Sequence, residues 1–249
     1  MVAVVRSCDR IGALSEGADF LTETRLGALG GSFNPIHFGH LFVARRIRDL
    51  FQLQRIHFIV AATPPHKPAG GLVAFTHRYA MVCLALAGTR SFLPSMVELD
   101  PPASPFSVHS LEKLDQKNRG ERARLFFIAG GDSLLDVGSW HESERLLASY
   151  DFVFVTRPGI RIPDPAALLP REARENMLDL RDHQPDEIRA VISKAERSGE
   201  RRVYLMDVGA PDISASEIRR LVAAGSPVDK LVPVRVREYI EKLRIYGEQ

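Results

Sequence analysis

The stretch from residue 30 to residue 40, GGSFNPIHFGH, holds the side chains best suited to chemistry on a phosphate group. His37 and His40 are three residues apart, so in the first turn of a helix they would project to the same side. An imidazole N–H can donate to a phosphate oxygen, and a protonated ring also offsets charge on a leaving group. Glycine has no Cβ, so the backbone N–H groups of Gly31 and Ser32 can approach a bound group closely. The stretch therefore predicts a phosphate-binding corner.

The two histidines have other interpretations. Histidines at positions i and i+3 could bind a metal, although no cysteine or carboxylate cluster close to them in the sequence completes a ligand set. They could also be structural histidines whose ring nitrogens are satisfied within the protein. His37 and His40 alone do not decide between these alternatives, and a second motif bears on the choice.

That second motif is ISASEIRRL, residues 213–221, near the other end of the chain. Ser214 or Ser216 is suited to cap a helix, with Glu217 in its first turn. In the simplest interpretation the serines do no more than cap this helix. The alternative is a second helix N-terminus directed at phosphate, with Ser216 donating its hydroxyl and the Arg219 guanidinium binding the β- and γ-phosphates.

The elements that must position these motifs alternate along the chain. Continuous apolar runs predict strands at 25–30, 55–62, 95–99, 124–130, 151–157 and 202–208. Helical periodicity predicts helices at 38–51, 75–87, 106–117, 141–150, 186–197, 216–224 and 233–243. Apolar strands that alternate with helices indicate a doubly wound, Rossmann-like α/β fold, in which a parallel sheet is covered by helices on both faces. Ligands then bind beyond the carboxyl ends of the strands.

The chain is expected to form a single domain over residues 25–249, preceded by a poorly ordered extension at 1–24. A proline-rich loop is expected at 63–71, and this loop is the natural candidate to close over a substrate. The charged segment 158–201 is placed only loosely around its one predicted helix.

Composition narrows the class of protein further. A formal net charge of +2 gives no bulk basic character, so nucleic acid is not an expected partner. No apolar run approaches the roughly 20 residues that span a bilayer, so no membrane association is expected. The only two cysteines, Cys8 and Cys83, predict neither a disulfide framework nor a thiolate metal site, and they favour a cytoplasmic location.

Taken together, the two phosphate motifs resemble the nucleotidylyltransferase superfamily, with its G-x-F-[D/N]-P-x-H-x-x-H and I-S-x-[S/T]-x-x-R patterns. The H-x-G-H of that superfamily is present at residues 37–40. Within the superfamily, the chain resembles bacterial nicotinate-nucleotide adenylyltransferases. The stretches that carry this resemblance are PPHK (64–67), HRYAMVCLA (77–85), IAGGDSLLDVGSWHESERLLASYDFVFVTRPG (128–159) and KLVPVRVREYIEKLRIY (230–246).

The resemblance implies a reaction in which ATP and nicotinate mononucleotide give nicotinate adenine dinucleotide and pyrophosphate, a step of NAD biosynthesis. The phosphate of the mononucleotide attacks the α-phosphorus of ATP directly. Such a transfer depends on positioning and on charge stabilisation rather than on a nucleophilic side chain. Mg²⁺ would accompany ATP, held mainly by phosphate oxygens and water, so no metal site made by the protein is expected.

The resemblance also assigns residues to the ATP end of the site. It implies catalytic roles for His37, His40 and Arg219, and ATP-binding roles for Gly31, Ser32, Lys67, Gly130, Asp132 and Ser216. Within these sets His40 is the stronger candidate to stabilise the transition state. Asp132 is suited to accept hydrogen bonds from a ribose diol, or else to cap the helical turn that follows it.

At the other end, the resemblance implies pyridine-nucleotide contacts for Asn34, Phe106, Ser107, Trp140 and Arg157. The resemblance implies that Trp140 stacks on the pyridine ring. By residue type alone, Trp140 would be expected to pack in the core. Asn34 stands where many relatives have aspartate. The stretch PFSVHS (105–110) stands where S-Y-T-x-x-T is common, which leaves the choice between an acid and an amide substrate open.

Two rival functions share most of these features. Phosphopantetheine adenylyltransferase has the same fold, but its chains are usually shorter and commonly have lysine at the position of Arg219. A nucleotide-binding regulator without catalysis is the rival of a different class. The presence of His37, His40, Ser216 and Arg219 together argues against it, because loss of catalysis would be expected to damage at least one of them.

Overall fold

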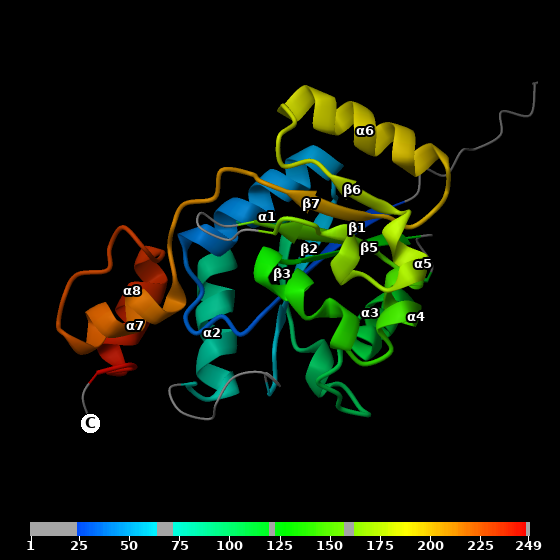
Figure 1. Cartoon of the computed structure of the whole chain (residues 1–249). Coiled ribbons are helices and arrows are strands. Elements are labelled where there is room, and N and C mark those ends of the chain that lie inside the picture. Colours follow the sequence, from blue (N-terminus) through cyan, green and yellow to red (C-terminus); the bar gives the residue numbers. More distant parts are fainter. Residues whose placement is uncertain (1–23, 64–71, 120–122, 157–161, 248–249) are drawn as a thin grey trace, which may run out of the picture.

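The computed structural model describes residues 24–63, 72–119, 123–156 and 162–247, which are built around one parallel sheet (Figure 1). Its seven strands lie in the order β3-β2-β1-β4-β5-β7-β6, and all neighbours pair in parallel. The strands are β1 (Thr24–Gly31), β2 (Arg55–Val60), β3 (Phe92–Ser95), β4 (Ala123–Gly130), β5 (Asp151–Val155), β6 (Met177–Asp179) and β7 (Val203–Met206).

Helices cover both faces of this sheet. The α-helices are α1 (Phe38–Phe51), α2 (Phe75–Leu86), α3 (Ser107–Lys117), α4 (Ser143–Ser149), α5 (Arg171–Arg174), α6 (Pro185–Arg197), α7 (Ala215–Ala223) and α8 (Val234–Lys242). Short 3₁₀ helices occur at η1 (Val97–Leu99), η3 (Gly131–Leu135), η4 (Val137–Ser139) and η5 (Ala166–Leu168). Among the described residues, none of the helices combines the length and the apolar character that crossing a bilayer requires.

Two apolar clusters, one on each side of the sheet, form the core. Side chains of α1, α2, α6, α7 and α8 pack into one cluster, and those of α3, α4 and α5 pack into the other. In Figure 1, α1 and α6 lie side by side over the sheet, while α8 lies beside α2. The continuous apolar strands are explained by this arrangement, since a strand buried on both faces has no solvent side that favours polar residues.

The chain reverses its direction of travel across the sheet between β1 and β4. From β1 it moves outward through β2 to β3, and it then returns to place β4 on the other side of β1. The ends of β1 and β4 are therefore adjacent, with Leu29 opposite Ile128 in the register. A crevice forms beyond strand ends at such a switch point, so both glycine-containing corners, at Gly31 and Gly130, open onto the same place.

The predicted fold class is confirmed, and so is the predicted helix near 186–197, which is α6. Gln184 and Glu187 form a capping box at its start, with Pro185 in the first turn. The domain prediction for 1–24 falls largely outside the described residues, and β1 begins at Thr24, one residue earlier than expected.

The structure contradicts one predicted element and adds a strand that the sequence analysis did not predict. The extended segment predicted at 95–99 is the end of edge strand β3 followed by the 3₁₀ turn η1. Pro94 obscured that strand in the sequence, although a proline is tolerated at a sheet edge, where one side of the strand is unpaired. The segment 158–201 also contains a strand, β6, whose three residues are too few to produce a recognisable pattern.

Candidate active site

A sharp corner joins β1 to the first helix. Phe33 has a φ of 46°, a left-handed conformation that is uncommon for a side chain of this size. Its ring is buried, which holds the corner in place. A Cβ on Gly31 would lie 3.0 Å from that ring, so only glycine fits without displacing it. The backbone of the corner is thereby kept open toward the end of the sheet.

His37 and His40 build the N-terminus of α1. His37 is the N-cap residue, and its backbone N–H donates to Nδ1 of His40 at 3.3 Å. Because Nδ1 of His40 accepts this bond, a neutral ring carries its proton on Nε2, which makes Nε2 the donor nitrogen of the ring. The two rings stack, with centroids 3.7 Å apart. A Cβ on Gly39 would lie 3.0 Å from the His37 ring, so this glycine provides the room for the stacked pair.

The second corner is the N-terminus of α7. Ser214 caps this helix, and its Oγ accepts the backbone N–H of Glu217 at 3.1 Å. Ser216 is exposed in the first turn, and its Oγ lies 3.3 Å from Nη2 of Arg219. Nη1 of Arg219 donates to the backbone oxygen of Asn34 at 2.9 Å. The C-terminal motif therefore contacts the corner that follows β1, as the prediction of a shared site requires.

A buried arginine fixes the loops around these corners. Arg78 in α2 is almost fully buried, and its guanidinium donates to four backbone oxygens, those of Ser32, Ala61, Ala62 and Val73, at 2.7–3.1 Å. One side chain thus ties the segments after β1 and β2 to the start of α2. A buried guanidinium is tolerated when its donors are satisfied in this way.

A buried carboxyl group lies beside that arginine. Glu98 in η1 accepts the backbone N–H of Ala62 at 2.7 Å and forms part of the wall of the central cavity. Burial raises the pKa of Glu98 to about 7, and the Ala62 N–H and the charges of Arg78 and Lys113 only partly offset this effect. Glu98 thus changes charge near neutral pH, unlike an exposed carboxyl group.

Asn34 is held at the junction of these elements. Its side-chain Oδ1 accepts a hydrogen bond of 2.7 Å from the hydroxyl of Tyr246, near the end of the chain, and a longer one of 3.4 Å from the backbone of Val73. Burial raises the pKa of the Tyr246 hydroxyl well above its usual range, so this hydroxyl remains a donor at neutral pH. Asn34 therefore has a structural role in addition to its position at the cavity.

A cavity of about 610 Å³ extends from these two corners along the ends of β1 and β4. Its wall includes the predicted residues Gly31, Ser32, Asn34, His37, His40, Phe106, Ser107, Gly130, Asp132, Trp140 and Ser216. Arg219 does not line the cavity but contacts Asn34 and Ser216, which do. Lys67 and Arg157 lie outside the described residues.

The wall beyond β4 combines polar and aromatic groups. Asp132 is exposed in the first turn of η3, directly after the corner at Gly130. Trp140 is half-buried at the end of η4, with its ring edge-on to Phe127 at 5.9 Å. It therefore combines the two roles that the sequence suggested, since it packs against the core and also lines the cavity.

Four residues of this site had no role in the sequence analysis: Arg78, Glu98, His141 and Tyr246. Arg78 and Tyr246 lie in stretches that carried the family resemblance, but neither stands beside a recognisable catalytic pattern. Glu98 is a single acidic residue between two apolar ones, and only the structure shows that it is buried. His141 directly follows Trp140, and its ring stacks on Phe106 with centroids 4.2 Å apart.

The fold and the two joined phosphate corners define a protein of the cytidylyltransferase-like class, and the sequence model of that family matches residues 28–221. Among similar curated proteins, the probable nicotinate-nucleotide adenylyltransferase of Geobacter metallireducens is 43% identical, covering 89% of this chain and 98% of its own. The protein of the same name from Pelobacter propionicus is 38% identical, covering 90% and 99%. This chain belongs to the nicotinate-nucleotide adenylyltransferase family.

Solved structures confirm the fold. The nicotinic acid mononucleotide adenylyltransferase of Plasmodium falciparum, in its complex with NaAD, superposes with a TM-score of 0.64. The two share 19% sequence identity, and the match covers 90% of this chain and 98% of the other. A protein from Vibrio parahaemolyticus, described as a nicotinate-nucleotide adenylyltransferase, has a TM-score of 0.54 and 14% identity.

Proposed function

We propose that this protein transfers the adenylyl group of ATP to nicotinate mononucleotide, forming nicotinate adenine dinucleotide and releasing pyrophosphate in NAD biosynthesis. The observation that carries the proposal is the junction of the two phosphate motifs, in which Arg219 of the second motif hydrogen-bonds Asn34 of the first. One cavity is thereby bordered by two helix N-termini, those of α1 and α7. Helix N-termini favour the bound negative charge of phosphates.

The reaction follows from this arrangement. A phosphate oxygen of the mononucleotide attacks the α-phosphorus of MgATP, and the bond from that phosphorus to the oxygen bridging to the β-phosphate breaks. Pyrophosphate leaves with the electron pair of the broken bond, so negative charge grows on the departing group. We assign the stabilisation of this charge to the Nε2–H of His40 and the guanidinium of Arg219. Mg²⁺ enters as part of the nucleotide substrate, bound to phosphate oxygens.

The aromatic end of the cavity suits a pyridine ring. Trp140 offers a half-buried ring at the cavity wall, and Phe106 lies on the same cavity. A flat, electron-poor pyridinium ring is attracted to an aromatic face. We assign the mononucleotide to this end and the triphosphate of ATP to the histidine end. The backbone of Phe106 and Ser107 is the expected neighbour of the substituent on the pyridine ring.

The test is pyrophosphate release by the purified protein with ATP and Mg²⁺ and one of three acceptors. Nicotinate mononucleotide, nicotinamide mononucleotide and phosphopantetheine are compared at equal concentration, with an acceptor-free reaction as the control. We expect the fastest release with nicotinate mononucleotide. Preference for phosphopantetheine would instead assign the protein to the sister activity, and no release with any acceptor would favour the non-catalytic regulator. A cytoplasmic location remains part of this proposal.

A further inference from the structure

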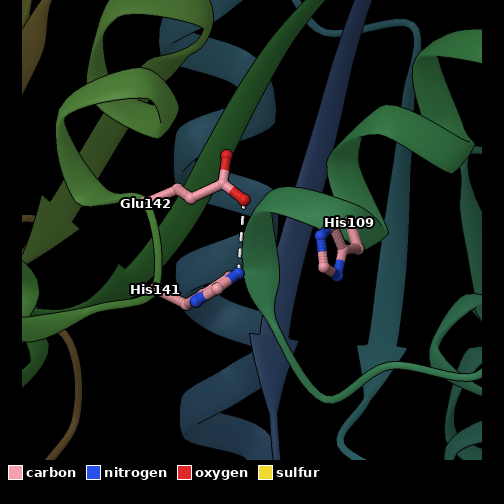
Figure 2. A group of neighbouring side chains, drawn as sticks. All are labelled: His109, His141 and Glu142. Carbon is pink, nitrogen blue, oxygen red and sulfur yellow. Dashed lines mark ion pairs between the residues drawn. The ribbon is translucent and has the colours of Figure 1, made fainter.

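Three side chains that could ligate a metal gather at the edge of the aromatic end of the cavity. His109 comes from the first turns of α3, and His141 and Glu142 come from the segment just before α4 (Figure 2). One ligand atom from each residue lies within 4.8 Å of the other two. His109 and His141 are 32 positions apart, and His141 and Glu142 are adjacent. These spacings do not form a recognisable ligand pattern, so the sequence analysis predicted no such site.

We propose that His109, His141 and Glu142 form a binding site for a divalent transition metal ion of the zinc type. Two imidazole nitrogens and one carboxylate oxygen are a donor set that such ions prefer, whereas Mg²⁺ favours oxygen donors alone. Ligand atoms in a tetrahedral zinc site lie about 3.3 Å apart. His141 Nε2 and Glu142 Oε1 are already 3.2 Å apart, so only His109 has to move closer.

Hydrogen bonds around the cluster orient two of the ligands. Nδ1 of His109 lies 2.7 Å from the hydroxyl of Ser104, which engages this nitrogen and leaves Nε2 as the expected ligand. The other oxygen of Glu142 pairs with Arg145, which also pairs with Glu112. Partners of this kind fix the orientation of a ligating residue, and Arg145 leaves the second carboxylate oxygen, Oε1, facing His141.

The position of the site connects it to the cavity. The His141 ring stacks on Phe106 and lies 5.5 Å from that of His109, centroid to centroid. The side chains of His141 and Glu142 are 42% and 36% exposed, so an ion can enter from solvent. A bound ion would link the start of α3, next to Ser107, to the segment that carries Trp140. These are the two walls of the aromatic end of the cavity.

The test is direct zinc binding, so it does not depend on the proposed reaction. Protein stripped of metal with a chelator, and free of ATP, is titrated with zinc chloride in a calorimeter. We expect one site in the natural protein, and a loss of affinity of about tenfold or more in H109A and in H141A. Ser104→Ala should weaken binding less than these two changes, because serine is not itself a ligand.

Two variants serve as matched controls. His183→Ala removes an exposed histidine that is not part of the cluster, and His40→Ala removes one member of the other histidine pair. Both should bind zinc as the natural protein does, and a large excess of Mg²⁺ should not compete. The proposal is overturned if the natural protein binds no zinc, if H109A and H141A bind it unchanged, or if His40→Ala alone abolishes binding. Circular dichroism of each variant without metal establishes that its fold is intact.

Discussion

Nη1 of Arg219 donates a 2.9 Å hydrogen bond to the backbone oxygen of Asn34, joining two residues that are 185 positions apart in the sequence. This contact ties the corner before α1 to the helix α7. The same guanidinium lies 3.3 Å from the hydroxyl of Ser216, so its second nitrogen is directed along the first turn of α7. Arg219 is therefore oriented before any phosphate binds, and less ordering is needed when one does.

Replacement of Arg219 tests this orientation. We expect Arg219→Lys to lower turnover about 100-fold, because an ammonium group cannot hold Asn34 and bind phosphate through separate nitrogens. Arg220→Ala is the matched control, since Arg220 is exposed and pairs only with Glu217 among the described residues. Pyrophosphate release is measured for both variants. Equal activity in the two variants would contradict a special role for Arg219.

The architecture could be predicted because the signals for it are local. Buried strands give continuous apolar runs, and α1 shows its buried face through Leu41, Ala44 and Ile47. These patterns depend on neighbouring residues and survive without knowledge of the fold. The three-residue strand β6 and the strand β3 with Pro94 were missed or misplaced because their stability comes from pairing with distant strands.

The site could be predicted only where its residues stand in motifs. His37, His40 and Ser216 lie close to turn signals, so their chemistry was visible in sequence order. The chemistry of Arg78 was not visible, because its role is to bind backbone oxygens of two loops, the one after β1 and the one after β2, that only the folded chain brings together. Glu98 was missed for the same reason, since its burial is produced by tertiary packing.

His40 provides the second prediction, in which catalysis and helix capping can be separated. His40→Ala removes the Nε2–H donor and should lower turnover about 100- to 1000-fold. It also removes the acceptor for the His37 N–H, so a loss of stability of about 1 kcal/mol is expected from the weakened cap. Activity and the thermal midpoint are measured together. Turnover like that of the natural protein would remove His40 from the mechanism.

The control for the loss of the cap is Ser214→Ala, which removes the N-cap of α7 without removing a predicted catalytic group. A similar loss of stability is expected, with a smaller loss of turnover than in His40→Ala. If the two variants lose equal activity, the effect of His40→Ala comes from the helix terminus rather than from the imidazole.

Trp140 gives a prediction about ligand binding. It is the only tryptophan, so the tryptophan fluorescence of the protein reports on this ring alone. Stacking of a pyridinium ring on its exposed part should quench that fluorescence when nicotinate mononucleotide is added. Trp140→Ala should weaken binding of the mononucleotide about tenfold or more, as expected for the loss of one stacked ring. An unchanged spectrum at saturating ligand would assign Trp140 to the core alone.

Glu98 gives a prediction about stability and pH. Burial raises the pKa of Glu98 from 4.5 to about 7. Between pH 4.5 and pH 7, the folded state therefore holds a proton on Glu98 that the unfolded state has lost. The stabilisation that this proton provides is complete below about pH 4.5 and is lost as the pH rises through 7. The size of the shift corresponds to about 3 kcal/mol in the free energy of unfolding.

Glu98→Gln tests this relationship, because glutamine has no ionisation and still offers an oxygen to the Ala62 N–H. The free energy of unfolding of this variant is measured by urea titration from pH 5 to pH 8. It should not show the decrease with rising pH that Glu98 causes in the natural protein. At pH 8 the variant should be more stable than the natural protein, by up to about 3 kcal/mol. Glu238→Gln, on the exposed side of α8, is the matched control and should follow the natural curve. Parallel curves for Glu98→Gln and the natural protein would show that the Glu98 carboxyl ionises as it does in water.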